Sequence, residues 1–149
     1  MPKLDLDAIP QTNATGYPPE FADKVQGRWY RRLAPAAGIS DFGASHVVLE
    51  PGAWSSQRHW HEDEDELVVM LAGEAVLVDD HGETVIHAGD VAAFAKNDGN
   101  GHVLINRSAA PCTFVAIGRS ADSACHYPDI DMHLFAGNGR QTRKDGSDF

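Results

Sequence analysis

Residues 59–66 read HWHEDEDE, so two histidines spaced by one residue stand directly before a run of carboxylates. Side chains alternate between the two faces of an extended segment, so His59 and His61 are expected to point to one side and Trp60 to the other. A third histidine, His102, follows in a turn-rich stretch downstream. Three imidazoles and one carboxylate form a mixed nitrogen and oxygen donor set that suits a divalent transition metal. A fold that gathers these residues would therefore contain a metal site.

Composition narrows the class of protein. With 149 residues, 42% of them hydrophobic and 23% charged, the chain is expected to form one domain, residues 1–149, with a core of its own. No apolar run approaches the ~20 residues that cross a bilayer, and the first residues lack the layout of a signal peptide. Two cysteines give no disulfide framework, which favours a cytoplasmic location. A formal net charge of −10 argues against nucleic acid and against a membrane surface as partners.

Short β-rich runs follow one another from residue 42 onward. Turn sequences separate them, among them PG at 51–52, AGD at 88–90 and NDGNG at 97–101. Many short strands with frequent turns favour an all-β sandwich or barrel over alternating strands and helices. The sequence DDHG at 79–82 also predicts a tight hairpin.

The signals on either side of these runs are weaker. We expect an irregular N-terminal arm at residues 1–41, in which 21–33 fits either a helix or an extended stretch. The barrel core is expected at 42–120, and a C-terminal segment ending in a polar tail at 121–149. No internal repeat or linker divides the chain.

The spacing of the site residues resembles the first signature of the cupin superfamily. Gly52 opens the segment, His59-x-His61 follows, then Glu66 after four residues and Gly73 after six more. In that family two histidines and a glutamate of this signature bind a metal inside a small β-barrel. Asp63, Glu64 and Asp65 are the rival carboxylates, and Asp65 is the second choice among them. Glu66 is preferred because it shares the period-2 phase of the apolar residues that follow it.

A second signature of the same family begins at Gly89-Asp90, runs through Phe94, and ends with His102 and, four residues on, Asn106. The chain has Ala95 where the family usually has Pro and Asn97 where it usually has Gly, and His102 comes two residues late. The departure leaves the turn geometry open but keeps the spacing of His102 to Asn106. The resemblance covers residues 43–119, and the phrases LEPGAWSSQRHWH, NGHVLINRS and YPDID are similar to small single-domain bacterial cupins of the conserved-barrel type.

The resemblance implies a jelly-roll barrel, also called a double-stranded β-helix, that encloses a cavity between two sheets. His59 and His61 would lie on one strand, Glu66 at the start of its hairpin partner and His102 on a neighbouring strand, all facing inward. This set would hold one divalent transition metal per chain: Fe, Mn, Zn, Ni or Co. It would leave open positions on a six-coordinate ion or complete a tetrahedral zinc site.

Two classes of function follow from such a site. The first is a metal-dependent enzyme acting on a small hydroxy, keto or enol substrate, with isomerase and dioxygenase chemistry ranked equally and lyase chemistry also admitted by the family. The second is a non-catalytic cupin that binds a metal or small ligand in a sensor or storage role. An open coordination shell facing a cavity would favour the enzyme.

The proton-transfer and substrate-binding residues are less well marked. Candidates for proton transfer are His46, His126 and Tyr127, and candidates for substrate contact are Gln57 and Phe94, although each has a plain packing or surface role as its alternative. Bare sheet edges invite pairing, so we also expect a homodimer embraced by the N-terminal arm and the C-terminal tail, the alternative being a monomer that uses both segments to cover its own edges.

Overall fold

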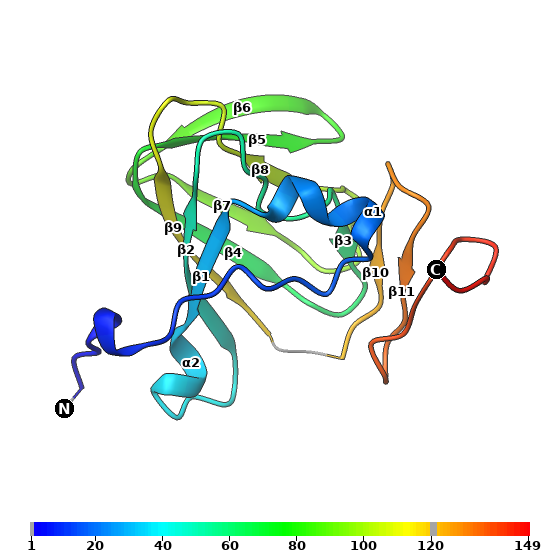
Figure 1. Cartoon of the computed structure of the whole chain (residues 1–149), viewed down its shortest axis with the longest axis horizontal. Coiled ribbons are helices and arrows are strands. Elements are labelled where there is room, and N and C mark those ends of the chain that lie inside the picture. Colours follow the sequence, from blue (N-terminus) through cyan, green and yellow to red (C-terminus); the bar gives the residue numbers. More distant parts are fainter. Residues whose placement is uncertain (1, 120–121) are drawn as a thin grey trace.

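In the residues that the computed structural model describes, 2–119 and 122–149, the strands form three antiparallel sheets (Figure 1). The largest sheet orders its strands as β1 (Arg28–Arg32), β2 (Gly43–Leu49), β9 (Cys112–Gly118), β4 (Glu66–Ala72) and β7 (Val91–Phe94). A second sheet contains β6 (Gly82–His87), β5 (Glu74–Asp79) and β8 (Val103–Ile105). The third contains β12 (Gln141–Thr142), β11 (His133–Leu134), β10 (Cys125–His126) and β3 (Trp60–His61). The all-β prediction is confirmed, whereas the expected boundary at residues 120 and 121 lies outside the described residues.

The core lies on the inner faces of the five-stranded sheet and of the sheet formed by β6, β5 and β8. On β4, Val68 and Met70 are buried while Leu67 and Leu71 are exposed, so the strand alternates with period 2. The buried side chains pack in one cluster with residues such as Leu49, Leu104 and Phe114. Glu66 is in phase with Val68 and Met70, and this phase directs its carboxylate to the interior.

Turns occur where the sequence predicted them. Residues 79–82 form the expected hairpin, because β5 and β6 pair with Asp79 opposite Gly82 and a two-residue loop between them. Gly73 connects β4 to β5 with a φ of 71°. A Cβ at Gly73 would lie 2.9 Å from the carbonyl oxygen of Pro111, so a side chain is excluded both by conformation and by space.

The N-terminal arm is more ordered than expected. Short helices occupy η1 (Leu6–Ala8), α1 (Pro19–Ala22), η2 (Asp23–Val25) and α2 (Leu33–Ala36). The stretch 21–33 is both helical and extended, since β1 follows η2 and pairs with β2 along its whole length. Thr12 then bridges to Tyr30, so the segment before α1 runs along the outer edge of β1, in blue in Figure 1.

The C-terminal segment also docks on the barrel. Its strands β10, β11 and β12 extend a sheet that begins at β3, and Thr142 on the last strand is buried. The predicted polar tail is therefore partly wrong, because residues 141–142 are a paired strand. None of the helices in the described ranges has the length and apolarity needed to span a bilayer.

Candidate metal centre

The four predicted metal ligands converge at one end of the barrel. His61 lies on β3, and His59, just before it, exchanges two backbone hydrogen bonds with His102, N–H to carbonyl distances being 3.1 and 2.9 Å. Glu66 is the first residue of β4. The expectation that β4 is the hairpin partner of the histidine strand is wrong. β4 pairs with β7 and β9, whereas β3 pairs with β10.

The ligand atoms have the mutual distances of a coordination shell. Glu66 Oε2 lies 2.7 Å from His102 Nε2, 3.5 Å from His61 Nε2 and 3.7 Å from His59 Nε2. The Nε2 atoms of His59 and His61 are 3.1 Å apart. Zinc lies about 2.0–2.2 Å from nitrogen and oxygen ligands, so adjacent ligands of one ion are ~3 Å apart. The arrangement fits an ion between these side chains.

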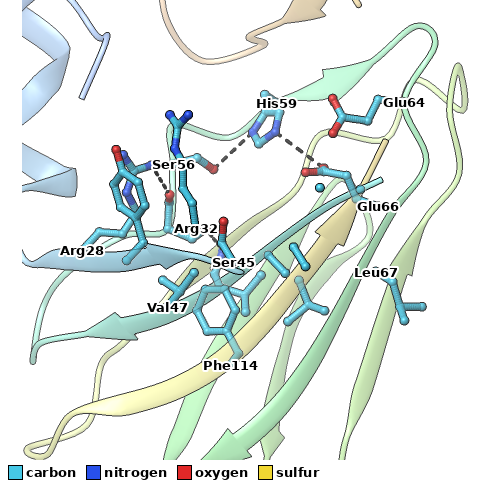
Figure 2. Close-up of a pocket in the computed structure, with 18 of the residues that line it drawn as sticks. Arg28, Arg32, Ser45, Val47, Ser56, His59, Glu64, Glu66, Leu67 and Phe114 are labelled. Carbon is cyan, nitrogen blue, oxygen red and sulfur yellow. Dashed lines mark hydrogen bonds and ion pairs between the residues drawn. The ribbon is translucent and has the colours of Figure 1, made fainter. Parts of the chain in front are cut away.

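The tautomer of His59 is fixed by its neighbours. Its Nδ1 lies 2.9 Å from the carbonyl oxygen of Gln57 and 3.2 Å from Ser56 Oγ, the latter contact drawn in Figure 2. A carbonyl oxygen only accepts, so Nδ1 carries the proton and Nε2 presents its lone pair to the site. The lone pair of His59 thus faces Nε2 of His61, a contact that a shared cation would stabilise.

Charge is arranged to suit a cation. Burial alone would raise the pKa of Glu66, but the hydrogen bond from His102 and the three nearby imidazoles outweigh it and lower the pKa to about 2. Burial lowers the pKa of His59 to about 4 and also lowers the pKa of His61. At neutral pH Glu66 is therefore an ionised carboxylate beside the neutral imidazoles of His59 and His61, which are the forms that bind metals.

Glu64 is a second carboxyl group at this site. Its Oε2 lies 3.6 Å from His61 Nδ1, and its side chain covers Gly118, where an added Cβ would lie 2.6 Å from Oε1. Burial, reinforced by the negative charge of Glu66, raises the pKa of Glu64 to about 8. The sequence placed Glu64 only among the rival metal ligands, although its even spacing from Glu66 indicates the same inward direction. Asp65 lies outside the cluster: it is exposed and accepts the Lys96 backbone N–H at 2.9 Å.

A cysteine missed by the sequence analysis also reaches the site. Cys125 pairs with His61 across β10 and β3, and its Sγ and the ring nitrogens of His59 and His61 lie within 4.8 Å of one another. Burial raises the pKa of the Cys125 thiol to about 12. His59, Glu66 and His102 form a second group of the same tightness. The two groups share His59.

The other predicted site residues fall at different distances from the ligands. Phe94 lines the cavity and stacks on His102, with ring centroids 3.6 Å apart. Gln57 is buried, donates to the Phe21 carbonyl and holds the ring of His59 through its own carbonyl. Its side chain is thus committed to packing within the protein.

The three candidates for proton transfer do not line the cavity. His46 lies between cavity-lining Ser45 and Val47 on β2 and so faces the opposite side of the sheet. His126 stacks on Trp60 and contacts Glu62 at 2.7 Å on the outer side of β10. Tyr127 is buried, its ring centroid 5.9 Å from that of His59.

A cavity of about 610 Å³ adjoins the cluster. His59, Glu64, Glu66 and His102 form one end of it, and residues of β1, β2 and the segment 14–17 form the other. Apolar side chains such as Phe114, Val47 and Leu104 also line it. Three of the four predicted ligands, His59, Glu66 and His102, therefore face a hollow large enough for a small organic molecule.

Comparison with known proteins identifies the architecture. Residues 45–118 match the family model described as Cupin domain. A sugar phosphate isomerase from a cupin superfamily, of Silicibacter pomeroyi, is 44% identical with a TM-score of 0.93, over 99% of this chain and 96% of that chain. A Cupin 2 conserved barrel domain protein of Salinispora arenicola is 25% identical with a TM-score of 0.58, over 81% and 88% of the two chains.

A more distant likeness shows the fold alone. A polyketide cyclase of Streptomyces resistomycificus is 16% identical with a TM-score of 0.66, over 93% of this chain and 89% of that chain. Among curated proteins, none matches the sequence. The predicted jelly-roll architecture is confirmed by these likenesses.

Proposed function

Because this chain belongs to the cupin superfamily, we propose that it is a metal-dependent isomerase of a small sugar phosphate. The observation that carries the proposal is the cluster of His59, His61, Glu66 and His102 at one end of a cavity, with Glu64 beside it. The Silicibacter pomeroyi relative named as a sugar phosphate isomerase supports the substrate class, since the two chains align over nearly their whole lengths.

The four side chains would hold one divalent transition metal, with Fe, Mn, Zn, Ni and Co all compatible with three imidazoles and a carboxylate. Such an ion supplies Lewis acidity toward the carbonyl and hydroxyl oxygens on adjacent substrate carbons. The chain's own part is to present those ligands in their binding forms and to exclude water. His59 is oriented by the Gln57 carbonyl, and Phe94 covers the ring of His102.

Glu64 is the residue we assign to proton transfer. An aldose–ketose isomerisation moves one proton between two neighbouring carbons and a second proton from the hydroxyl oxygen to the carbonyl oxygen. A single carboxylate can carry the first of these protons, acting first as base and then as acid. Glu64 lines the cavity beside the cluster and is not needed as a ligand. Its pKa of about 8 lies close to neutrality, as a group that both accepts and donates a proton requires.

Solvent exchange tests this assignment. The protein is purified without chelator, its metal content is measured, and sugar phosphates are incubated with it in D₂O while NMR follows deuterium entering the two carbons. We expect exchange with the wild type, loss of both metal and exchange in His102→Ala, and loss of exchange alone in Glu64→Gln. Asp63→Asn, an exposed neighbour, is the matched control. A metal-loaded wild type that exchanges no sugar phosphate would contradict the proposal.

The relative at 44% identity favours isomerase over dioxygenase chemistry, which the sequence had ranked equally. A binding role without catalysis is the alternative class, and the same measurement separates the two. A metal-loaded protein that binds sugar phosphates without exchanging their protons would be a binding protein.

The proposal also includes a cytoplasmic homodimer. The edge strands β6 and β7 expose Val85 (51%) and Val91 (58%), apolar side chains that a partner subunit would cover. Cys112 and Cys125 are unbridged, which suits a reducing compartment. Light scattering on the wild type and on Val91→Lys tests the dimer, which the added charge should disrupt.

A further inference from the structure

Strand β1 presents two arginines to the cavity. Arg28, Tyr30 and Arg32 occupy alternate positions and all three line the hollow, whereas Trp29 and Arg31 between them do not. Figure 2 shows Arg28 and Arg32 rising from β1 on the same side as Ser56 and His59. The cavity thus has a carboxylate and imidazole end and, facing it, a guanidinium end.

The guanidinium of Arg28 donates its hydrogen bonds to uncharged backbone carbonyl groups. Its Nη1 donates to the Ser55 carbonyl at 2.8 Å and its Nη2 to the Ala14 carbonyl at 3.5 Å. Its Nε is buried without a hydrogen-bond partner, and the guanidinium lies 5.3 Å from the ring centroid of Tyr30. A half-buried cation with an unused donor is costly unless an anion completes its surroundings.

Four of the six other arginines are paired with carboxylates, whereas Arg31 and Arg119, which do not line the cavity, also form no ion pair among the described residues. Arg58, Arg107, Arg140 and Arg143 each form an ion pair with an aspartate or glutamate. In the part of the chain that the structure describes, neither Arg28 nor Arg32 forms such a pair. Arg32 is exposed and directed into the same hollow. The chain has 22 acidic and 12 basic residues, yet Arg28 and Arg32 on this cavity wall have no carboxylate partner among the described residues.

We propose that Arg28 and Arg32 bind the phosphate group of the substrate while its oxygenated carbons lie at the Glu64 and Glu66 end, an assignment that rests on the proposed function. Two guanidinium groups match the charge of about −1.5 to −2 that a phosphate monoester carries near neutrality. A carboxylate, with a single charge, would leave one of them uncompensated. Planar guanidinium donors also suit the bidentate geometry of phosphate oxygens.

The two ends are close enough for one small molecule because a single short loop contacts both. Ser55 accepts from Arg28 through its carbonyl, and Ser56, the next residue, places its Oγ 3.2 Å from His59 Nδ1. Consecutive Cα atoms are ~3.8 Å apart. A phosphorylated compound of a few carbons can therefore reach from the arginines to the metal ligands.

Inorganic phosphate is the probe, titrated by calorimetry into the full-length protein as purified and again after EDTA treatment, so that phosphate bound to a metal ion is recognised. We expect Arg32→Gln, which removes no side-chain hydrogen bond among the described residues, to weaken phosphate binding about 10- to 100-fold. Arg28→Gln should do the same, with circular dichroism and melting temperature confirming that it folds. Arg31→Gln is the matched control, since it removes the same charge from the opposite face of β1.

Equal phosphate affinity in Arg32→Gln and wild type would overturn the site, and so would an equal loss in Arg31→Gln. Activity separates this result from the proposed function. If the wild type isomerises sugar phosphates and Arg32→Gln leaves KM unchanged, the proposed function stands and the arginine site is rejected. If phosphate binding depends on Arg32 but the protein has no isomerase activity, the arginine site stands and the proposed function is rejected. A higher KM with kcat preserved supports both.

Discussion

Glu64 makes the stability of the metal-free protein depend on pH in a way that one substitution should remove. Its ordinary pKa is 4.5, and burial together with the charge of Glu66 raises the pKa to about 8 in the folded protein. The side chain is 19% exposed, so solvent screens it only partly. Glu64→Gln keeps the shape of the side chain and abolishes its titration.

The sign of the effect follows from the number of protons bound. Between the two pKa values the folded protein holds one more proton at Glu64 than the unfolded chain does, so the free energy of unfolding falls as pH rises, by about 1.4 kcal/mol per pH unit. His59 acts in the opposite direction, because its pKa is lowered from 6.5 to about 4, and it stabilises the fold increasingly up to pH 6.5. Glu66, with a pKa of about 2, has its full effect above pH 4.5. From pH 6.5 to 8 only the Glu64 slope remains among these groups, and we expect a loss of about 2 kcal/mol.

Urea unfolding of the EDTA-treated protein at constant ionic strength measures this loss. The wild type should lose stability between pH 6.5 and 8, while Glu64→Gln should be nearly flat over the same interval. Asp63→Asn, an exposed neighbour, should follow the wild type. A slope in Glu64→Gln equal to that of the wild type would refute the reasoning, because the extra proton would then be held elsewhere.

Three further outcomes test the fold and the ligand set. Asn106 is fully buried and its amide forms four hydrogen bonds, so Asn106→Ala should cost about 3 kcal/mol in urea unfolding; a loss below about 1 kcal/mol would contradict this. His61→Ala should lower metal content measured by mass spectrometry without unfolding the barrel, whereas Cys125→Ser should leave it unchanged, and the reverse pattern would move the site to the thiol. Gly73→Ala should lower the melting temperature far more than Gly52→Ala, since both have positive φ but only Gly73 lacks space for a Cβ; equal effects would contradict the packing argument.

Local periodicity was enough to predict the parts of the site that lie on one strand or turn. His59 and His61 share a face because they are two residues apart, and Glu66 faces inward because it keeps the phase of the buried residues of β4. The hairpin at 79–82 is equally local, since turn chemistry and strand pairing lie within a few residues.

Long-range pairing accounts for what was missed. β3 is two residues long, and its partner β10 lies more than 60 residues away, so no local pattern indicates that Cys125 sits opposite His61. β1 lies in the region that the sequence predicted to be an irregular arm. Because β1 pairs with β2, Arg28 and Arg32 face the cavity. A basic stretch of sequence does not reveal which of its cations turn inward when the strand partner is unknown.

The loop that carries Ser55 and Ser56 is hydrogen-bonded to residues at both ends of the cavity. Ser55 is fixed on both sides, because its carbonyl accepts from Arg28 and its Oγ accepts the Leu104 backbone N–H at 3.0 Å. Ser56 and the Gln57 carbonyl then set the ring of His59. Arg28 is thus connected to the ring of His59 by hydrogen bonds through two consecutive residues, while Arg32 has no hydrogen bond to this loop among the described residues. In the proposed phosphate site Arg32 would therefore contribute charge alone, whereas Arg28 would also connect the bound phosphate to the loop that orients His59.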